Sequence, residues 1–129
     1  MRVASGFRGR EATSINIELK ASDSSANPHL ALAGVIAAGL DGIQRGLTPP
    51  APALHDPVNL NDEERRASNV RPLPASQAEA LQNLENDEVL TSALGDLMTR
   101  CYLATRRAEF AKGEAKGLEW ARAATFTVY

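Results

Sequence analysis

The chain has 129 residues, of which 43% are hydrophobic, and its formal net charge at pH 7 is −2. These values favour one folded domain and argue against global disorder. They give no electrostatic reason to expect nucleic-acid binding, which needs a basic face, or a polybasic membrane anchor.

Cysteine use and the N-terminal residues indicate a compartment. The single cysteine, Cys101, excludes a disulfide within the chain and a cysteine-based zinc cluster. The first ten residues carry three arginines and no apolar core, so they do not resemble a signal peptide. We therefore expect a protein of the reducing cytoplasm.

The first twenty residues are typical of extended structure. Residues 14–20 alternate strictly, with Ile15, Ile17 and Leu19 on one face and polar side chains on the other. Residues 1–7 are a candidate partner strand, joined through the stretch 6–11. We expect a β-hairpin, or the edge of a larger sheet, because a two-stranded hairpin alone is only marginally stable in water.

An apolar helix should follow this hairpin. Asn27 is a favourable N-cap, Pro28 suits the first helical position and Gly46 can end the helix. The residues between them leave almost no polar face, which predicts burial on most sides. The apolar run at residues 30–40 is shorter than the roughly 20 residues that cross a bilayer.

The remaining chain is predicted to be helical after a proline-rich loop at residues 48–57. The predicted helices span residues 61–67, 77–84, 87–94, 96–112 and 115–125. A capping box that begins at Ser76 marks the start of the second of these. Cys101 lies on the apolar stripe of the helix at 96–112, which predicts a buried thiol. The predicted fold class is α+β and predominantly helical, with a hairpin or sheet edge followed by about five helices.

The polar face of residues 14–20 is one candidate site, because it presents Asn16, Glu18 and Lys20 in a row. A strand face in contact with solvent would show the same pattern. In the functional interpretation, Glu18 binds a hard cation such as Mg²⁺ or Mn²⁺, whose preferred ligands are oxygens. Lys20 would then bind an anionic group beside that cation.

Three arginines near two glycines form a second candidate site. Arg2, Arg8 and Arg10 lie around Gly6 and Gly9 at the start of the chain. Guanidinium groups suit phosphate, to which they donate forked, charge-assisted hydrogen bonds. Three arginines in an exposed turn are also ordinary surface. No pattern in the sequence indicates a nucleophilic triad or a glycine-rich phosphate loop, and we assign no catalytic residue.

Several segments together resemble the glutamine synthetase family. They read INIELK at residues 15–20, DSSANPHLALA at 23–33 and AAGLDGI at 37–43, with LP at 73–74 and EAL at 79–81. The resemblance is dense over residues 2–50 and looser to Tyr129. It identifies the chain as the C-terminal portion of the family's catalytic domain, which has a guanido-kinase-like fold. Residues 1–20 would be strands of the active-site sheet and 27–129 the helical part.

This resemblance implies an ATP-dependent carboxylate–amine ligase. Members of the family make glutamine from glutamate, ammonia and ATP through an acyl phosphate, with Mg²⁺ or Mn²⁺. Their active sites form between neighbouring subunits of a ring. Glutamate, ATP and an amine would be the ligands of the complete enzyme.

Four residues acquire roles through the resemblance. Glu18 matches a glutamate that binds the metal near the ATP phosphates. Lys20 matches a position, usually arginine, that holds the substrate carboxylate. Arg2 matches an arginine near ATP, and Asn16 falls near ATP where many members have arginine. The departures at positions 16 and 20 point to a divergent branch of the family, and such branches resemble γ-glutamyl ligases that act on amines other than ammonia.

The matched portion lacks most of the family's active site. The small N-terminal domain, the other metal-binding glutamates, the histidine ligand and the ammonia-site loop precede it in the family. Two hypotheses follow. The chain is part of a ligase, inactive alone, that completes a site with the missing portion. Alternatively, it is a non-catalytic interaction or regulatory module derived from the ligase, which associates with ligase rings or with itself.

Overall fold

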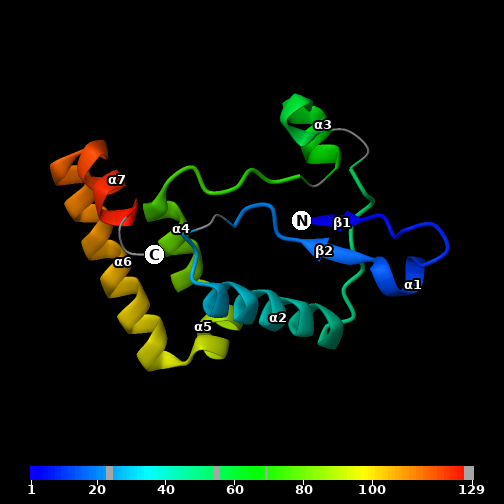
Figure 1. Cartoon of the computed structure of the whole chain (residues 1–129), viewed down its shortest axis with the longest axis horizontal. Helices are drawn as coiled ribbons and strands as arrows, with labels where there is room; N and C mark the ends of the chain where they lie inside the picture. Colours follow the sequence, from blue (N-terminus) through cyan, green and yellow to red (C-terminus); the bar gives the residue numbers. More distant parts are fainter. Residues whose placement is uncertain (23–24, 54–55, 69, 127–129) are drawn as a thin grey trace.

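The computed structural model describes residues 1–22, 25–53, 56–68 and 70–126. These ranges contain seven α-helices, a 3₁₀ helix and a two-stranded sheet, and confirm a predominantly helical α+β fold (Figure 1). The elements are β1 Arg2–Ala4, α1 Glu11–Ser14, β2 Asn16–Glu18, α2 Pro28–Gln44, η1 Pro57–Asn59, α3 Asp62–Ala67, α4 Gln77–Glu85, α5 Glu88–Leu94, α6 Asp96–Lys116 and α7 Leu118–Phe126.

The expected hairpin is confirmed, with shorter strands than predicted. β1 and β2 are antiparallel, and the residues opposite each other are Arg2 and Glu18, Val3 and Ile17, and Ala4 and Asn16. The predicted strand at 14–20 is wrong at both ends, because Ser14 belongs to α1 and Lys20 to a turn. The Ser14 hydroxyl accepts a hydrogen bond from the Phe7 backbone N–H at 2.7 Å, which holds the connecting loop closed.

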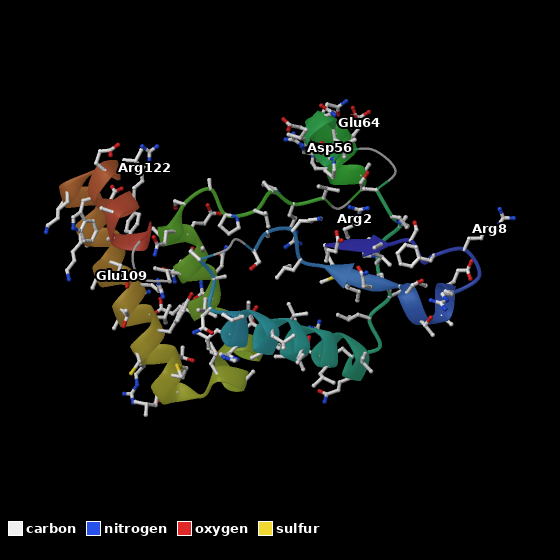
Figure 2. The ribbon with its side chains drawn as sticks, in the orientation of Figure 1. Arg2, Arg8, Asp56, Glu64, Glu109 and Arg122 are labelled. Atoms are coloured by element: carbon white, nitrogen blue, oxygen red, sulfur yellow. The ribbon has the colours of Figure 1, made fainter. Side chains whose placement is uncertain are left out.

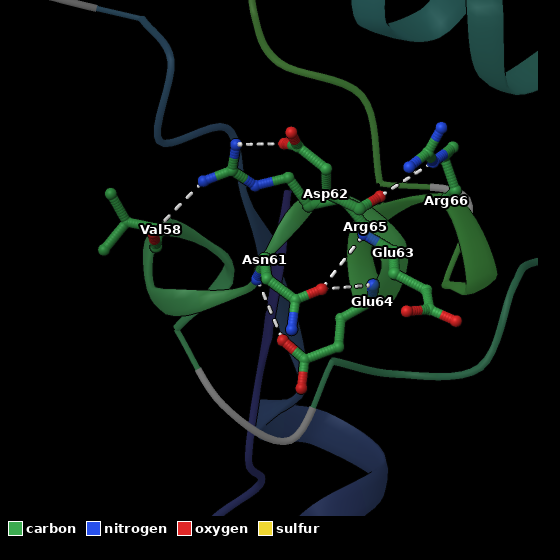
Figure 3. Close-up of polar contacts among 7 residues, drawn as sticks. All are labelled: Val58, Asn61, Asp62, Glu63, Glu64, Arg65 and Arg66. Carbon is green, nitrogen blue, oxygen red and sulfur yellow. Dashed lines mark hydrogen bonds and ion pairs between the residues drawn. The ribbon is translucent and has the colours of Figure 1, made fainter.

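Side-chain caps fix the helix starts that the sequence predicted. The Asn27 side chain accepts hydrogen bonds from the first backbone N–H groups of α2, and Ser76 and Asp87 cap α4 and α5 in the same way. In α3 the Asn61 side chain accepts from the Glu64 N–H, and the Glu64 carboxylate accepts from the Asn61 N–H (Figure 3). Each cap satisfies backbone donors that have no partner within their helix.

The best-packed part of the molecule lies where α4, α5 and α6 meet. Leu81 of α4 and Leu103 of α6 are each 6% exposed, and they are the only buried apolar residues in the described ranges. Thr99 is also buried, and its hydroxyl donates to a backbone carbonyl of α5 at 3.3 Å. On the surface above them, Arg107 of α6 donates two hydrogen bonds to the Glu85 carboxylate.

Helix α2 does not meet the expectation of burial on most sides. It packs against α5 (Figure 1). None of its residues is buried. Large apolar side chains on its other side are exposed, namely Leu32, Ile36, Leu40 and Ile43. Among the described elements, α5 covers one side of this helix. In these ranges no helix combines the length and the apolar character needed to cross a membrane.

The predicted burial of Cys101 is wrong, because the thiol-bearing residue is exposed. The buried positions of α6 are Thr99 and Leu103. At about 100° per residue, position 101 faces nearly the opposite direction from both. Leu97, one helical turn before Cys101 on the same side of α6, is likewise 71% exposed. The apolar stripe read from the sequence was therefore displaced around the helix.

Candidate functional site

The hairpin gathers three charged side chains on one face. Glu18 ends β2 and lies opposite Arg2 of β1, while Lys20 follows two residues later. The Lys20 Nζ lies 2.8 Å from Glu18 Oε2, and Arg2 Nη1 lies 3.6 Å from the same oxygen. The structure thus brings together three of the four residues to which the sequence assigned ligand-binding roles.

The environment of Glu18 favours its ionised form. Its Oε2 is closed off from solvent and accepts no hydrogen bond of good geometry from the described residues, so the contact with Lys20 is best treated as an ion pair. The Lys20 ammonium lowers the pKa of Glu18 below its usual value, desolvation opposes this effect, and Arg2 adds to the lowering. The carboxylate is therefore charged at neutral pH.

Asn16 extends the same face of β2. Its position is two residues before Glu18, and side chains two residues apart in a strand point to the same side. It lies opposite Ala4 and is exposed. Asn16 and Glu18 therefore share one face of β2, as the alternation in the sequence predicted. Lys20 lies in a turn beyond the strand and joins them through its contact with Glu18.

The second candidate site does not form a cluster. Arg2 lies over the strands, whereas Arg8 lies at the far end of the loop and points away from them (Figure 2). Arg10 occupies the position before α1 and is exposed. What the sequence did not predict is the direct approach of Arg2 to Glu18, since this depends on the register of the two strands.

The described residues do not by themselves form a complete site for a divalent metal. Mg²⁺ and Mn²⁺ take several oxygen ligands. Within the described part of the chain, no group of three or more histidine, cysteine, aspartate or glutamate side chains could hold an ion. Glu18 offers one carboxylate, whose oxygens are of the ligand type that these ions prefer.

The sequence matches the family model for the catalytic domain of glutamine synthetase over residues 1–124. The chain belongs to this family. It is 38% identical over 104 residues to a glutamine synthetase of Methanocaldococcus jannaschii, and the aligned residues make up 81% of the chain and 23% of that relative. It is 39% identical over 111 residues to a glutamine synthetase of Thermus thermophilus, and the aligned residues make up 86% of the chain and 23% of the relative.

A third relative carries a different name. The chain is 37% identical over 119 residues to a gamma-glutamylpolyamine synthetase of Streptomyces coelicolor, which covers 92% of the chain and 25% of that protein. The chain thus spans about a quarter of the length of the curated relatives that it matches. Membership of the family is established for the matched portion, as the resemblance predicted.

Proposed function

We propose that this chain supplies one part of the active site of an ATP-dependent carboxylate–amine ligase. The observation that carries the proposal is the cluster on the hairpin, in which the Glu18 carboxylate lies between Lys20 and Arg2. The chain's membership of the glutamine synthetase family supports it. The complete enzyme joins glutamate to an amine through an acyl phosphate. Residues 1–20 contribute to the site and residues 27–129 support it.

Each residue of the hairpin face has a proposed role. Glu18 is one oxygen donor for Mg²⁺ or Mn²⁺, which in the complete enzyme neutralises charge as the phosphoryl group moves. Lys20 binds the substrate carboxylate as a point charge, without the fork that arginine would offer. Arg2 and Asn16 contact ATP, Arg2 by charge-assisted hydrogen bonds to phosphate and Asn16 by its amide.

The isolated chain should be inactive, because a single carboxylate does not hold the metal. Its partners are the remaining portion of a ligase and, through that portion, other subunits. We place it in the cytoplasm, where its exposed thiol, Cys101, stays reduced.

The amine substrate is either ammonia or a larger amine. Lysine at position 20 and asparagine at position 16 favour a divergent branch of the family. Similarity to a relative named as a gamma-glutamylpolyamine synthetase supports including polyamines among the amines to be assayed.

A second candidate function is a non-catalytic interaction module derived from the ligase. The exposed apolar side of α2 favours it, because a large apolar surface suits association with another protein. Under this alternative the chain joins a ligase assembly and its function does not depend on Glu18.

One experiment separates the two candidates. The chain is co-expressed with the Thermus thermophilus glutamine synthetase from which the matched segment is deleted, and phosphate release is measured with glutamate, ATP and an amine. We expect activity that Glu18→Gln lowers by at least about 100-fold, a loss typical of removing one group that stabilises developing charge. Glu114→Gln on α6 removes the same charge away from the hairpin and should retain activity. Full turnover by Glu18→Gln would exclude Glu18 from the mechanism.

A further inference from the structure

Two cationic side chains cover the same oxygen of Glu18. Lys20 Nζ lies 2.8 Å from Glu18 Oε2, and Arg2 Nη1 lies 3.6 Å from it. The Glu18 side chain as a whole is 36% exposed, yet this oxygen is closed off from solvent. A further ligand of Oε2 therefore has to take the place of one of the two cations.

Lys20 is the partner that can leave more easily. Arg2 lies on β1 and is held opposite Glu18 by the register of the strands. Lys20 lies beyond β2 in a turn, which the Ser22 N–H closes by donating to the Leu19 carbonyl at 3.3 Å. The turn holds the backbone of Lys20, while its side chain is 63% exposed and carries the charge on a flexible four-carbon stem. The ammonium can therefore swing away from Glu18 without any change in the strands.

The contact between Lys20 and Glu18 is weak enough to yield to a divalent cation. An ion pair between exposed side chains strengthens an association by no more than about fivefold. A divalent cation carries twice the charge of an ammonium, and carboxylate oxygens are among its preferred ligands. Glu18 should therefore exchange its lysine partner for the metal.

We propose that Lys20 and the divalent metal compete for the Glu18 carboxylate, and that the ammonium displaced from Glu18 binds the substrate carboxylate. The inference rests on the proposed function for the identity of both ligands. While Lys20 is paired with Glu18, its ammonium is less available to a free carboxylate. Each of the two ligands should therefore raise the affinity for the other, and the metal should bind before the substrate.

Lysine suits this exchange better than arginine would. Arginine presents five N–H donors in a rigid fork and can hold two carboxylates at once. An ammonium is a compact point charge, so Lys20 stays close to one carboxylate at a time. The identity of residue 20 thus determines how strongly metal binding and substrate binding are coupled.

The first test follows both side chains by nuclear magnetic resonance in the isolated chain. Mg²⁺ is added while the Glu18 carboxylate carbon and the Lys20 ammonium nitrogen are observed. We expect both signals to shift, with the Lys20 signal moving toward its position in Glu18→Gln, which removes this carboxylate. Lys112 of α6 is the internal reference, and sodium chloride of equal ionic strength controls for screening. A shift of Glu18 without a shift of Lys20 would overturn the proposal, because the metal would then bind without displacing the lysine.

The second test measures Mn²⁺ affinity by electron paramagnetic resonance in the complex with the truncated Thermus thermophilus glutamine synthetase. A single-chain chimera, in which this chain replaces the relative's matched segment, gives the same measurement where the two pieces do not associate. Lys20→Met should bind Mn²⁺ about two- to fivefold more tightly than the wild type, because the competing ammonium is gone. Lys112→Met removes the same charge from α6 and should have no effect.

Glutamate provides the measure of coupling in the same assay. Added glutamate should tighten Mn²⁺ binding in the wild type but not in Lys20→Met. Lys20→Arg keeps the charge, so it should retain the wild-type affinity for Mn²⁺ and lose most of the effect of glutamate.

Failure of this inference differs from failure of the proposed function. Equal Mn²⁺ affinity in the wild type and Lys20→Met, or the same effect of glutamate in both, would overturn the competition. If Glu18→Gln still weakens Mn²⁺ binding in that case, Glu18 remains a metal ligand and the proposed function stands. An Mn²⁺ affinity that Glu18→Gln leaves unchanged would contradict the proposed function and the inference together.

Discussion

Leu103→Ala tests where the core lies, because this leucine is one of the two buried apolar residues in the described part of the chain. Replacing a buried leucine by alanine costs about 2–5 kcal/mol, from lost transfer energy and the cavity that remains. Small domains are stable by about 5–15 kcal/mol, and a core with so few buried side chains belongs near the lower limit. A loss of about 3 kcal/mol would therefore remove roughly half of the stability.

The assay is urea unfolding of the isolated chain followed by far-UV circular dichroism. With a slope of about 2 kcal/mol per M urea, the Leu103→Ala midpoint should fall by about 1.5 M. Leu97→Ala is the matched control, since it deletes the same atoms from the same helix at a residue that is 71% exposed. It should change stability by less than about 0.5 kcal/mol. Equal shifts in the two variants would refute the placement of the core.

Three further predictions concern single groups. Glu85→Gln should destabilise the chain at pH 7 but not in acid. The reason is that Arg107 lowers the pKa of the Glu85 carboxyl in the folded chain below 4.5. In urea titrations, the extra stability of the wild type over the variant should therefore fade as the pH falls below that value. A stability difference between the wild type and Glu85→Gln that grows in acid would contradict this prediction. Asn27→Ala should cost about 1 kcal/mol, measured by the same titration, because it removes the α2 cap. Cys101 should react with a thiol reagent as fast in the native chain as in urea, because it is exposed. A much slower reaction in the native chain would show that the thiol is buried, as the sequence had predicted.

Helix starts could be predicted because their causes are local. Asn27 with Pro28, the box at Ser76 and the aspartate at position 87 each satisfy backbone donors within a few residues, whatever surrounds them. The single-turn helix α1 was not predicted from the sequence. It depends on Ser14 bonding back across the loop to Phe7, a contact between residues seven apart.

Burial could not be predicted in the same way, because it depends on which elements are present to cover a face. Ile17 carries the apolar alternation expected of a buried strand face, yet it is 64% exposed. Glu18, on the polar face, is the less exposed of the two because Arg2 and Lys20 cover its carboxylate. The pattern in the sequence anticipates a larger sheet than these residues contain.

The candidate site could be predicted in part from the sequence. Alternation places Asn16 and Glu18 on one face of β2, whereas Lys20 lies in a turn beyond the strand and reaches that face through its ion pair with Glu18. The approach of Arg2 to Glu18 needed the pairing register, which the alternation does not specify. The separation of Arg8 from Arg2 likewise follows from the path of the loop (Figure 2).

The most direct test of the central claim is Mn²⁺ binding followed by electron paramagnetic resonance, in the isolated chain and in its complex with the truncated relative. We predict weak binding by the chain alone and a tight site in the complex. Glu18→Gln should weaken that site by more than about tenfold, since even changes to groups that only orient a metal ligand cost 10–100-fold. Equal affinity in the Glu18→Gln complex, or tight binding by the isolated chain, would contradict a site shared between this hairpin and the rest of the ligase.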